Sequence, residues 1–556
     1  PGLLILRGSG YVEGDCIMIR RLSVKGYRKL RDIDWSPSDG LNILVGDNSA
    51  GKSTILDAIE LVMTCRTNGR SAHADLSPYW FNLQDVAEFY AQVSGADQSS
   101  IKLPEICIEA YFGNSGLGDI RGLNNSNNED AAGLQLKIDV PEELRCEFLS
   151  VCKSDDHQFR SVPVEYYRLE WRTFKGRPIL KTPKDVSCAR IDSLPRTSSR
   201  AIDSYARNAL DEVLSDEQVR KVSNKYHDLR QEVDQAILSE MNGSLVVPHQ
   251  LDSMDFKMDQ SPRSDWRNSV IIEFDDVPLP FAGKGNEITA RAHIALENSA
   301  DKRVLLVEEP ESHLSHTSLF ELLDLLESSL NGRQAFVSTH SPFVLNRLGL
   351  DRLALVSEGN SPISIENLSE ETVQYFKRLS GYDTLRIILA RKLVLVEGPS
   401  DEMIFKWAYK KQYGHYPEVD AIDVMEYGIR GKRALELCHA LDRANVSVLR
   451  DNDGEEPSKW INDTKDFICK GKREMFIGKP EDGSTLEPQM VKANTSAISV
   501  LAKIVGEDSA KTDLLVKYMK SHKTDWALRI LLDKDGSKGL QAPGYIRAAI
   551  DFIAKG

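Results

Sequence analysis

The chain has 556 residues, which is more than one hydrophobic core accommodates, so we expect two or three domains. Its formal net charge of −14 argues against a broadly basic nucleic-acid coat, leaves room for a local basic groove, and suits a protein that gathers carboxylates around metal ions. No apolar run reaches the roughly 18 residues of a transmembrane helix, so no membrane partner is expected. Its eight cysteines contain no CxxC pair, which predicts reduced thiols and a cytoplasmic protein rather than a zinc site.

A phosphate-binding loop is the first strong motif along the chain. Residues 1–17 precede Met18, which reads like a natural start, so we expect them to be an N-terminal extension outside the fold. The motif GDNSAGKST (46–54) then follows an apolar strand and precedes a helical segment, as such a loop requires. Lys52 is expected to reach the β- and γ-phosphates of ATP, and Ser53 to ligate Mg²⁺. The predicted nucleotide-binding residues are Gly46, Asn48, Gly51, Lys52, Ser53 and Thr54.

The segment from about 113 to 262 changes character within the first predicted domain, 18–385. It begins with a Gly/Asn-rich stretch and continues with long polar segments of helical periodicity, notably over 200–241. We therefore expect a helical insertion there. A surface subdomain and a dimerisation element explain this pattern equally well.

Two further motifs follow in the order that an ATPase requires. The strand in VLLVEEPESHLS (304–315) delivers Glu308, expected to hold Mg²⁺ or its waters, and Glu309, expected to polarise the attacking water. His340, in FVSTHSP, ends another strand, where it can contact the γ-phosphate. Between the P-loop and these strands, Gly283 and Gly285 open a helix whose N-terminus can bind a phosphate.

A second acidic site is predicted in residues 386–556. The apolar strand LVLV runs into Glu397, and the strand VSVL runs through Arg450 into Asp451 and Asp453. Neighbouring parallel strands bring their carboxyl ends to one edge, where Asp401 at the next helix start also faces. Clustered carboxylates repel unless cations neutralise them, and oxygen-only ligands suit Mg²⁺ or Mn²⁺. The spacing therefore predicts a metal site.

These motifs resemble two known families joined in one chain. The P-loop, glycine-turned helix, LLVEEPE and STHSP resemble the ABC-type ATPase heads of chromosome-maintenance and recombination-repair ATPases. VEGPSDE and RDND resemble the glutamate and DxD motifs of the TOPRIM fold. Their combination resembles the OLD (overcoming lysogenization defect) nuclease family. The fold class expected is α/β: an ABC-type P-loop ATPase head with a helical insertion, followed by a Rossmann-like TOPRIM domain.

The resemblance implies further residues and partners. Paired heads would sandwich ATP, with Gly283 and Gly285 acting in trans, so a homodimer or higher homo-oligomer is expected. GSTLEPQMV and DGSKGLQAPG resemble segments that supply Glu487 as a further metal ligand and Lys538 as a phosphate-stabilising lysine. Family members act on DNA in antiphage defence, sometimes with a helicase-like or reverse-transcriptase partner. The expected catalytic residues are Glu309, His340, Glu397, Asp451, Asp453 and Lys538, and the expected metal ligands are Ser53, Glu308, Glu397, Asp401, Asp451, Asp453 and Glu487.

Three functions compete for this sequence. The leading hypothesis is an ATP-regulated, Mg²⁺- or Mn²⁺-dependent DNA endonuclease. The alternative is a non-catalytic ATP-driven DNA clamp or sensor with a degenerate TOPRIM site, against which the acids at 397, 451 and 453 argue. A topoisomerase-like or primase-like enzyme is the third, but no motif places the nucleophilic tyrosine that topoisomerase action needs.

Overall fold

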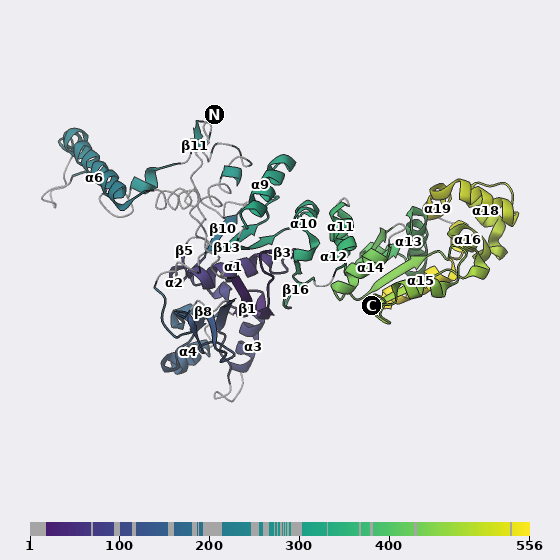
Figure 1. The fold of residues 1–556 in the computed structure, drawn as a ribbon, viewed down its shortest axis with the longest axis horizontal. Helices are drawn as coiled ribbons and strands as arrows, with labels where there is room; N and C mark the ends of the chain where they lie inside the picture. The colour runs from purple at the N-terminus through teal and green to yellow at the C-terminus, as the bar shows by residue number, and fades with distance from the viewer. Residues whose placement is uncertain are drawn as a thin grey trace. The chain divides into compact units, whose positions relative to one another are not determined.

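The computed structural model describes most of the chain between Met18 and Lys555, and contacts divide it into two compact units (Figure 1). One unit comprises Pro1–His340 with Val356–Pro362, and the other comprises Ser341–Leu355 with Ile363–Gly556. The predicted domain boundary at residue 385 stays a prediction. The described residues are 18–67, 70–93, 101–113, 118–153, 161–180, 186, 188–192, 214–245, 255–259, 266–271, 273–274, 276–278, 281, 283, 285, 288–290, 303–330, 332–365, 368–378, 382–427, 431–533 and 536–555.

Two sheets organise the first unit. The antiparallel sheet has the order β2-β1-β6-β8-β7, with β9 also pairing with β8. The second sheet contains the run β10-β13-β14-β3, in which neighbouring strands are parallel. The strands are β1 Met18–Tyr27, β2 Leu30–Trp35, β3 Leu41–Val45, β6 Ile106–Gly113, β7 Arg121–Gly122, β8 Ala131–Asp139, β9 Arg168–Thr173, β10 Cys188–Asp192, β13 Val304–Glu308 and β14 Gln334–Ser338.

Helix α1 (Lys52–Thr64) lies between these two sheets. It contacts β1, β6 and β8 of the antiparallel sheet, and β10, β13 and β14 of the parallel one. Most of its residues are buried, which is the pattern of a helix enclosed on all sides. The predicted phosphate-binding loop opens this helix, so the core of the unit anchors the loop.

The remaining described elements of the first unit are shorter or peripheral. They include the two-residue strand pairs β4–β5 and β11–β12. Their bounds are β4 Arg66–Thr67, β5 Arg70–Ser71, β11 Glu273–Phe274, β12 Val277–Pro278, α2 Ala72–Asp75, α3 Leu83–Val93, α4 Arg145–Cys152, α6 Asp216–Val233, a π-helical turn Asp234–Leu238, α7 Ser239–Asn242 and α9 His316–Ser328. None of the helices in the described part of the chain is long and apolar enough to cross a membrane.

The segment 113–262 is less uniformly helical than its composition predicts. β8 and β9 belong to the antiparallel sheet, and β10 pairs with β13. In strands that are buried on both faces, apolar residues do not alternate regularly with polar ones. Periodicity alone therefore did not distinguish these strands from the expected helical insertion. The expected helix is present as α6, which begins with a capping box between Ser215 and Gln218, whereas residues 200–213 lie outside the described residues.

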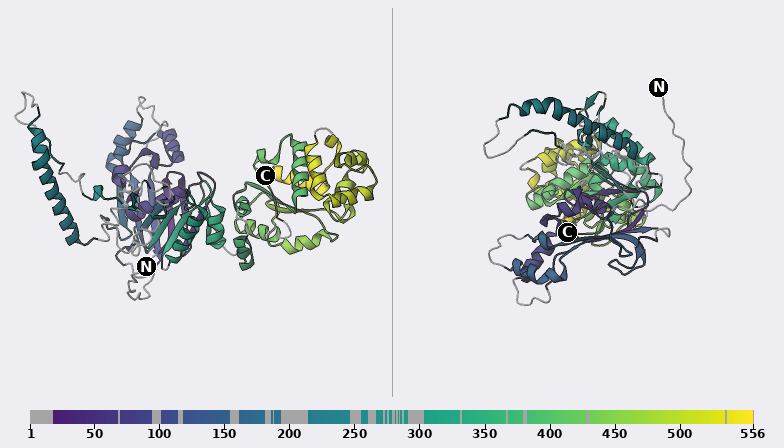
Figure 2. Two further views of the ribbon diagram at one scale, coloured as in Figure 1. Left: turned by 90° about the horizontal axis from the view of Figure 1, so that it is seen from above. Right: turned by 90° about the vertical axis from the view of Figure 1, so that its left-hand side faces the viewer.

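A parallel sheet forms the centre of the second unit, with the order β18-β17-β19-β20 (Figures 1 and 2). Val394 and Val396 of β17 join a large apolar cluster with α13, α19 and α20, while Leu393 and Leu395 are buried on the opposite face. The strands of this sheet are β17 Lys392–Val396, β18 Ile422–Glu426, β19 Val446–Arg450 and β20 Arg473–Ile477. β15 Leu353–Leu355 and β16 Ile363–Ser364 pair antiparallel with each other and are not part of it.

Helices pack around this sheet, as the left view of Figure 2 shows. α11 and α12 contact α14, and α13 contacts α19 and α20, so the helices form layers around the strands. The helices are α10 Pro342–Leu348, α11 Glu370–Arg378, α12 Tyr382–Leu389, α13 Pro399–Tyr413, α14 Gly431–Ala440, α15 Pro457–Thr464, α16 Leu486–Ala493, α17 Ile498–Val505, α18 Thr512–Ser521, α19 Lys523–Leu532 and α20 Gly544–Lys555.

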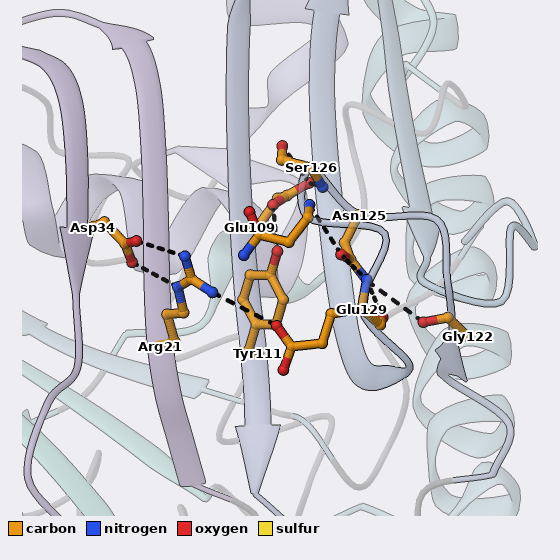
Figure 3. A network of polar contacts seen from close by, with 9 residues as sticks. Arg21, Asp34, Glu109, Tyr111, Gly122, Asn125, Ser126 and Glu129 are labelled. Atoms are coloured by element: carbon orange, nitrogen blue, oxygen red, sulfur yellow. Dashed lines mark hydrogen bonds and ion pairs between the residues drawn. The ribbon is translucent and has the colours of Figure 1, made fainter.

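A fully buried carboxylate, Glu109 on β6, ties a loop to the antiparallel sheet (Figure 3). Its Oε1 accepts hydrogen bonds from Ser126 N (2.9 Å), Ser126 Oγ (3.0 Å) and Gln135 Nε2 (2.6 Å). Its Oε2 accepts one from the Tyr111 hydroxyl at 2.8 Å. A buried carboxylate is tolerated when its oxygens are satisfied in this way, so the network is structural.

Replacing Glu109 is expected to destabilise the first unit strongly. Glu109→Ala leaves the buried Gln135 amide and Tyr111 hydroxyl without this acceptor, which should lower the free energy of unfolding by about 2–4 kcal/mol. Denaturant unfolding followed by circular dichroism measures the change. Glu129→Ala is the matched control, because this half-exposed carboxylate only meets Arg21 at 3.6 Å and should cost under about 1 kcal/mol. Equal effects of the two substitutions would contradict a structural role for the Glu109 network.

Candidate functional site

The predicted phosphate-binding loop connects β3 to α1. A Cβ atom on Gly46 would lie 2.3 Å from the carbonyl oxygen of Val356, so only glycine fits there. Gly51 has φ of 108° and precedes the first residue of α1. Lys52 is buried and donates hydrogen bonds to the carbonyl oxygens of Gly46 (2.9 Å) and Asp47 (3.0 Å). The lysine is thus folded onto its own loop, in the place that phosphate oxygens would take.

Parallel strand order brings the other ATPase motifs to the same edge. β14 lies between β13 and β3, with Glu308 in register with Ser338, so all three strands end together. Glu309 follows β13 in a left-handed conformation, φ 44°, and its Oε1 lies 3.9 Å from His340 Nε2. The negative charge of Glu309 acts on Lys52 and favours its charged form. The sheet therefore places the predicted lysine, carboxylate and histidine around one location.

Burial sets the charges of these groups. Desolvation lowers the pKa of Lys52 to about 8, against the opposing pull of Glu309, Asp47 and Glu311. Burial, followed by the charge of Lys52, lowers the pKa of His340. The histidine is therefore neutral near neutral pH, and able to donate or accept a hydrogen bond at a phosphate oxygen.

Glu311 was missed in the sequence, although it lies in the quoted motif. Its Oε1 accepts hydrogen bonds from Thr339 Oγ1 (2.8 Å) and from His340 N (2.7 Å). The chain after β13 is thereby tied to the chain after β14. No sequence signal separates Glu311 from a solvated surface acid.

Arg190 on β10 is the other unanticipated residue. Its side chain is 6% exposed and pairs with Glu308 Oε2 at 2.6 Å, Asp57 Oδ1 at 2.6 Å and Glu60 Oε2 at 2.9 Å. Asp57, which is buried on α1, also pairs with Arg28. The carboxylate predicted to hold Mg²⁺ is therefore held by an arginine in this structure.

The other predicted nucleotide residues have less defined surroundings. Ser53 and Thr54 lie in the first turn of α1, and Asn48 is exposed on the loop. Gly283 has φ of 39°, and a Cβ on Gly285 would lie 3.5 Å from the His313 carbonyl oxygen. Their action across a dimer stays a prediction.

The second unit gathers acidic side chains at the carboxyl edge of its sheet. β17 and β19 are adjacent and parallel, and Glu397 and Asp451 directly follow them. Asp401 lies in the first turn of α13 and is 8% exposed. Asp451 Oδ2 accepts a hydrogen bond from Leu486 N at 3.0 Å, which brings the start of α16, with Glu487, to the same edge.

Burial and mutual repulsion act on these acids together. Desolvation is the largest cause in each case, and it raises the pKa of Glu397 and of Asp401 to about 7. The pKa of Asp451 rises to about 8 through burial, with added repulsion from Asp401, Glu397 and Glu487. The cluster therefore resists full ionisation unless a cation is present.

The remaining predicted residues of this unit differ in placement. Asp453, with φ of 51°, pairs with Arg450 at 3.3 Å. Glu487 Oε2 accepts a hydrogen bond from Thr485 Oγ1 at 2.7 Å. Lys538 is exposed on the short turn Gly536–Gly539. The roles assigned to these three residues stay predictions.

The acids fit a divalent cation by chemistry. They are carboxylates only, they lie at one sheet edge, and each raises the pKa of its neighbours. In the part of the chain that the structure describes, however, no three His, Cys, Asp or Glu side chains are already placed to hold one ion. The carboxylates would therefore have to turn toward a metal together.

Two supporting residues at this edge carry no recognisable sequence signal. Asn452 is fully buried and donates to the carbonyl oxygens of Gly478 (3.0 Å) and Gly483 (2.7 Å). The Tyr545 hydroxyl, from α20, donates to Asp451 Oδ1 at 3.4 Å. Arg473, in the basic segment KGKR, is buried and donates hydrogen bonds to Phe467 O and Arg443 O.

Fold and sites together define a two-part protein: a P-loop ATPase head of the ABC type and a TOPRIM domain. Three sequence families match the corresponding segments: an AAA ATPase domain over 18–160, an "AAA domain, putative AbiEii toxin, Type IV TA system" over 193–346, and an "Overcoming lysogenization defect protein-like, TOPRIM domain" over 388–453. The chain thus carries AAA ATPase segments followed by an OLD-like TOPRIM segment, and the predicted fold class is confirmed.

Individual relatives agree with these matches. The OLD nuclease of Thermus scotoductus is 23% identical over 83% of this chain and 90% of its own length. The RecF protein of Stutzerimonas stutzeri is 40% identical over 15% of this chain, a match that spans only 21% of that relative. The C-terminal region of the Burkholderia pseudomallei OLD protein matches 30% of this chain and 98% of its own, at 16% identity, but its TM-score of 0.24 supports no conclusion about the fold.

Arg190 is expected to be essential for the stability of the first unit. Arg190→Met would leave the carboxylates of Asp57, Glu60 and Glu308 without this buried partner, which should cost about 3–5 kcal/mol in the free energy of unfolding. Arg31→Met is the matched control, since Arg31 pairs with Asp85 and Glu88 near the surface and its loss should change the stability little. Thermal and urea unfolding test both variants. A stable Arg190→Met protein would show that the acids are neutralised in another way.

The acid cluster predicts a pH dependence of stability without metal. Raised pKa values mean that the folded chain binds more protons than the unfolded chain, so the cluster's contribution to stability falls as the pH rises from about 5 to about 8. Asp451→Asn should flatten this slope, whereas Asp463→Asn, at an exposed position of α15, should not. Unfolding midpoints measured in EDTA across this range test the prediction. Identical slopes for wild type and Asp451→Asn would contradict it.

Proposed function

We propose that the chain is an ATP-regulated, divalent-metal-dependent DNA endonuclease. The observation that carries this proposal is the cluster of Glu397, Asp401 and Asp451 at the carboxyl edge of a parallel sheet, where burial and repulsion favour a bound cation. The match to the OLD-like TOPRIM family and to a relative named as a nuclease supports it. Nicking and double-strand cleavage are both open to such a site.

In the ATPase half, each residue has a distinct task. Lys52 exchanges its bonds to Gly46 and Asp47 for phosphate oxygens of the substrate ATP, and Ser53 faces the associated cation. Glu309 accepts a proton from the attacking water, and neutral His340 hydrogen-bonds the γ-phosphate. Glu308 can serve the cation only after loosening its pair with Arg190, so ATP binding would rearrange this edge.

In the nuclease half, carboxylates would hold Mg²⁺ or Mn²⁺. The bound metal supplies an activated water and neutralises charge on the cleaved phosphate. The residues that would hold it are Glu397, Asp401, Asp451, Asp453 and Glu487. The Leu486 N–H and Tyr545 hydroxyl orient Asp451 for this role, while Asn452 fixes the loop that carries Asp453. Lys538 would stabilise negative charge on the departing oxygen.

We also propose that the chain self-associates, because ATP-dependent heads of this type act in pairs. The polar helix α6 with its π-turn and α7 exposes an apolar series that would suit a second copy of the chain: Val222, Leu229, Ile237 and Met241. We infer a homodimer or higher homo-oligomer in which Gly283 and Gly285 complete the partner's ATP site.

We also infer a cytoplasmic role in antiphage defence, from the family and from the cysteines. Six of the described cysteines are free thiols, which suits a reducing compartment: Cys65, Cys107, Cys146, Cys152, Cys438 and Cys469. A helicase-like protein or a reverse transcriptase with its non-coding DNA would be the accompanying partner.

A second function remains open, a non-catalytic ATP-driven DNA clamp or sensor. Its support is that no three acids are assembled for a metal among the described residues. The two functions differ in whether the chain breaks DNA.

Cleavage of supercoiled plasmid distinguishes them. Wild type with Mg²⁺ or Mn²⁺ is expected to give nicked or linear DNA, and Asp451→Ala should reduce the rate by at least about 100-fold, since it removes a central ligand. Asp463→Ala, an exposed acid on α15, is the matched control and should cleave normally. Reactions with and without ATP, and with Lys52→Ala, reveal whether ATP activates or restrains cleavage.

Each outcome decides between the functions. Equal cleavage by Asp451→Ala and wild type would place the chemistry elsewhere and reject the proposed site. ATP hydrolysis without cleavage in any condition would favour the clamp. If the cleavage rate is the same with and without ATP, and the same in Lys52→Ala as in wild type, ATP regulation is rejected and the nuclease function is retained.

A further inference from the structure

Arg450 occupies the acidic cluster of the second unit. It is the last residue of β19 and directly precedes Asp451. Its Nη1 lies 3.3 Å from Glu397 Oε1, and its Nη2 lies 3.3 Å from Asp453 Oδ2. One guanidinium thus bridges two of the predicted metal ligands, which come from the ends of adjacent strands.

An aromatic ring holds this guanidinium from the other side. The Cζ of Arg450 lies 3.6 Å from the ring centroid of Trp460, on α15. The indole N–H of Trp460 is directed to the carbonyl oxygen of Asn452 at 3.4 Å, so the ring is attached to the acidic loop. Stacking on tryptophan stabilises a guanidinium without requiring any carboxylate.

The contacts of Arg450 with the acids are loose. Charge-assisted hydrogen bonds are usually about 2.7–2.9 Å long, and both contacts here are longer. Its Nε is buried and has no hydrogen-bond partner. The contacts of Arg190 are shorter, because it binds Glu308 and Asp57 at 2.6 Å. Arg190 is therefore a permanent partner of its acids, and Arg450 is a replaceable one.

We propose that Arg450, retained by Trp460, is an internal counter-cation that a divalent metal must displace from Glu397 and Asp453. This inference rests on the metal-dependent function proposed above. A guanidinium and a divalent metal at the same carboxylates carry like charges and repel each other, so Arg450 weakens metal affinity. Because the stack on Trp460 survives without the carboxylates, the arginine stays beside the site after displacement.

Direct metal binding tests this competition. Mn²⁺ is titrated calorimetrically into the full chain without nucleotide, so that the phosphate-binding loop contributes little. The variants are Arg450→Met, which keeps the length of the side chain without its charge, and Trp460→Leu, which removes the stack. Lys459→Met is the matched control: it removes a neighbouring positive charge whose described contacts are Glu455 and the Trp460 ring. Asp451→Ala identifies the heat that belongs to this site.

Arg450→Met is expected to bind Mn²⁺ about three- to tenfold more tightly than wild type, the gain from removing a competing ion pair. Trp460→Leu should tighten binding by about twofold, because the guanidinium loses its anchor but not its charge. Lys459→Met should bind as wild type does. In EDTA, Arg450→Met should unfold at a lower temperature than wild type, and Mn²⁺ should raise its midpoint more than that of wild type.

The outcomes distinguish a failure of this inference from a failure of the proposed metal-dependent function. If wild type binds Mn²⁺ at the Asp451-dependent site and Arg450→Met binds equally or more weakly, the counter-cation role is overturned and the metal-dependent function stands. If neither protein binds Mn²⁺ there, both are overturned. A purely structural arginine would lower the unfolding temperature in EDTA and in Mn²⁺ alike, with no gain in affinity, which would also overturn the inference.

Discussion

Negative charge collected at the ends of parallel strands has to be compensated, and arginine side chains do this in both units. Arg190 joins the acids of α1 to Glu308 after β13, and Arg450 joins Glu397 after β17 to Asp453 after β19. Without these cations, several buried carboxylates would repel one another at short range. Each arrangement places an arginine on an acid that the chemistry would assign to a metal.

The two arginines nevertheless serve different purposes. Arg190 is nearly inaccessible and makes short contacts with acids from different elements, so it belongs to the core that fixes α1 against the parallel sheet. Arg450 makes longer contacts with its acids, and its guanidinium stacks on the ring of Trp460. The first arginine maintains the frame around the nucleotide loop, while the second suits a site whose occupant changes. At both edges an arginine neutralises clustered acids. That arginine is a permanent partner at the ATPase edge and a replaceable one at the acidic edge.

Several sequence expectations depend only on local chemistry, and these agree with the structure most closely. The P-loop glycines, the strands before Glu308 and Glu397, and the helix start at Asp401 all follow from short motifs. Features that depend on contacts between distant parts of the chain were not predicted. β8 and β9 lie inside a segment expected to be helical, because a strand's identity there depends on partners far away in the chain. Arg473 lies in the basic segment KGKR, yet its side chain is buried and bonds to a backbone carbonyl.

The sequence by itself determined the two motif sets, their order, and hence the two-part fold. It also determined which carboxylates follow apolar strands, since this is written in consecutive residues. Only the tertiary structure decided that Arg190, Glu311, Tyr545 and Trp460 belong to these sites, because each reaches its partner across elements that are distant in sequence. Electrostatic compensation depends on distances in space, and no pattern along one strand or helix encodes which cation will lie beside which acid.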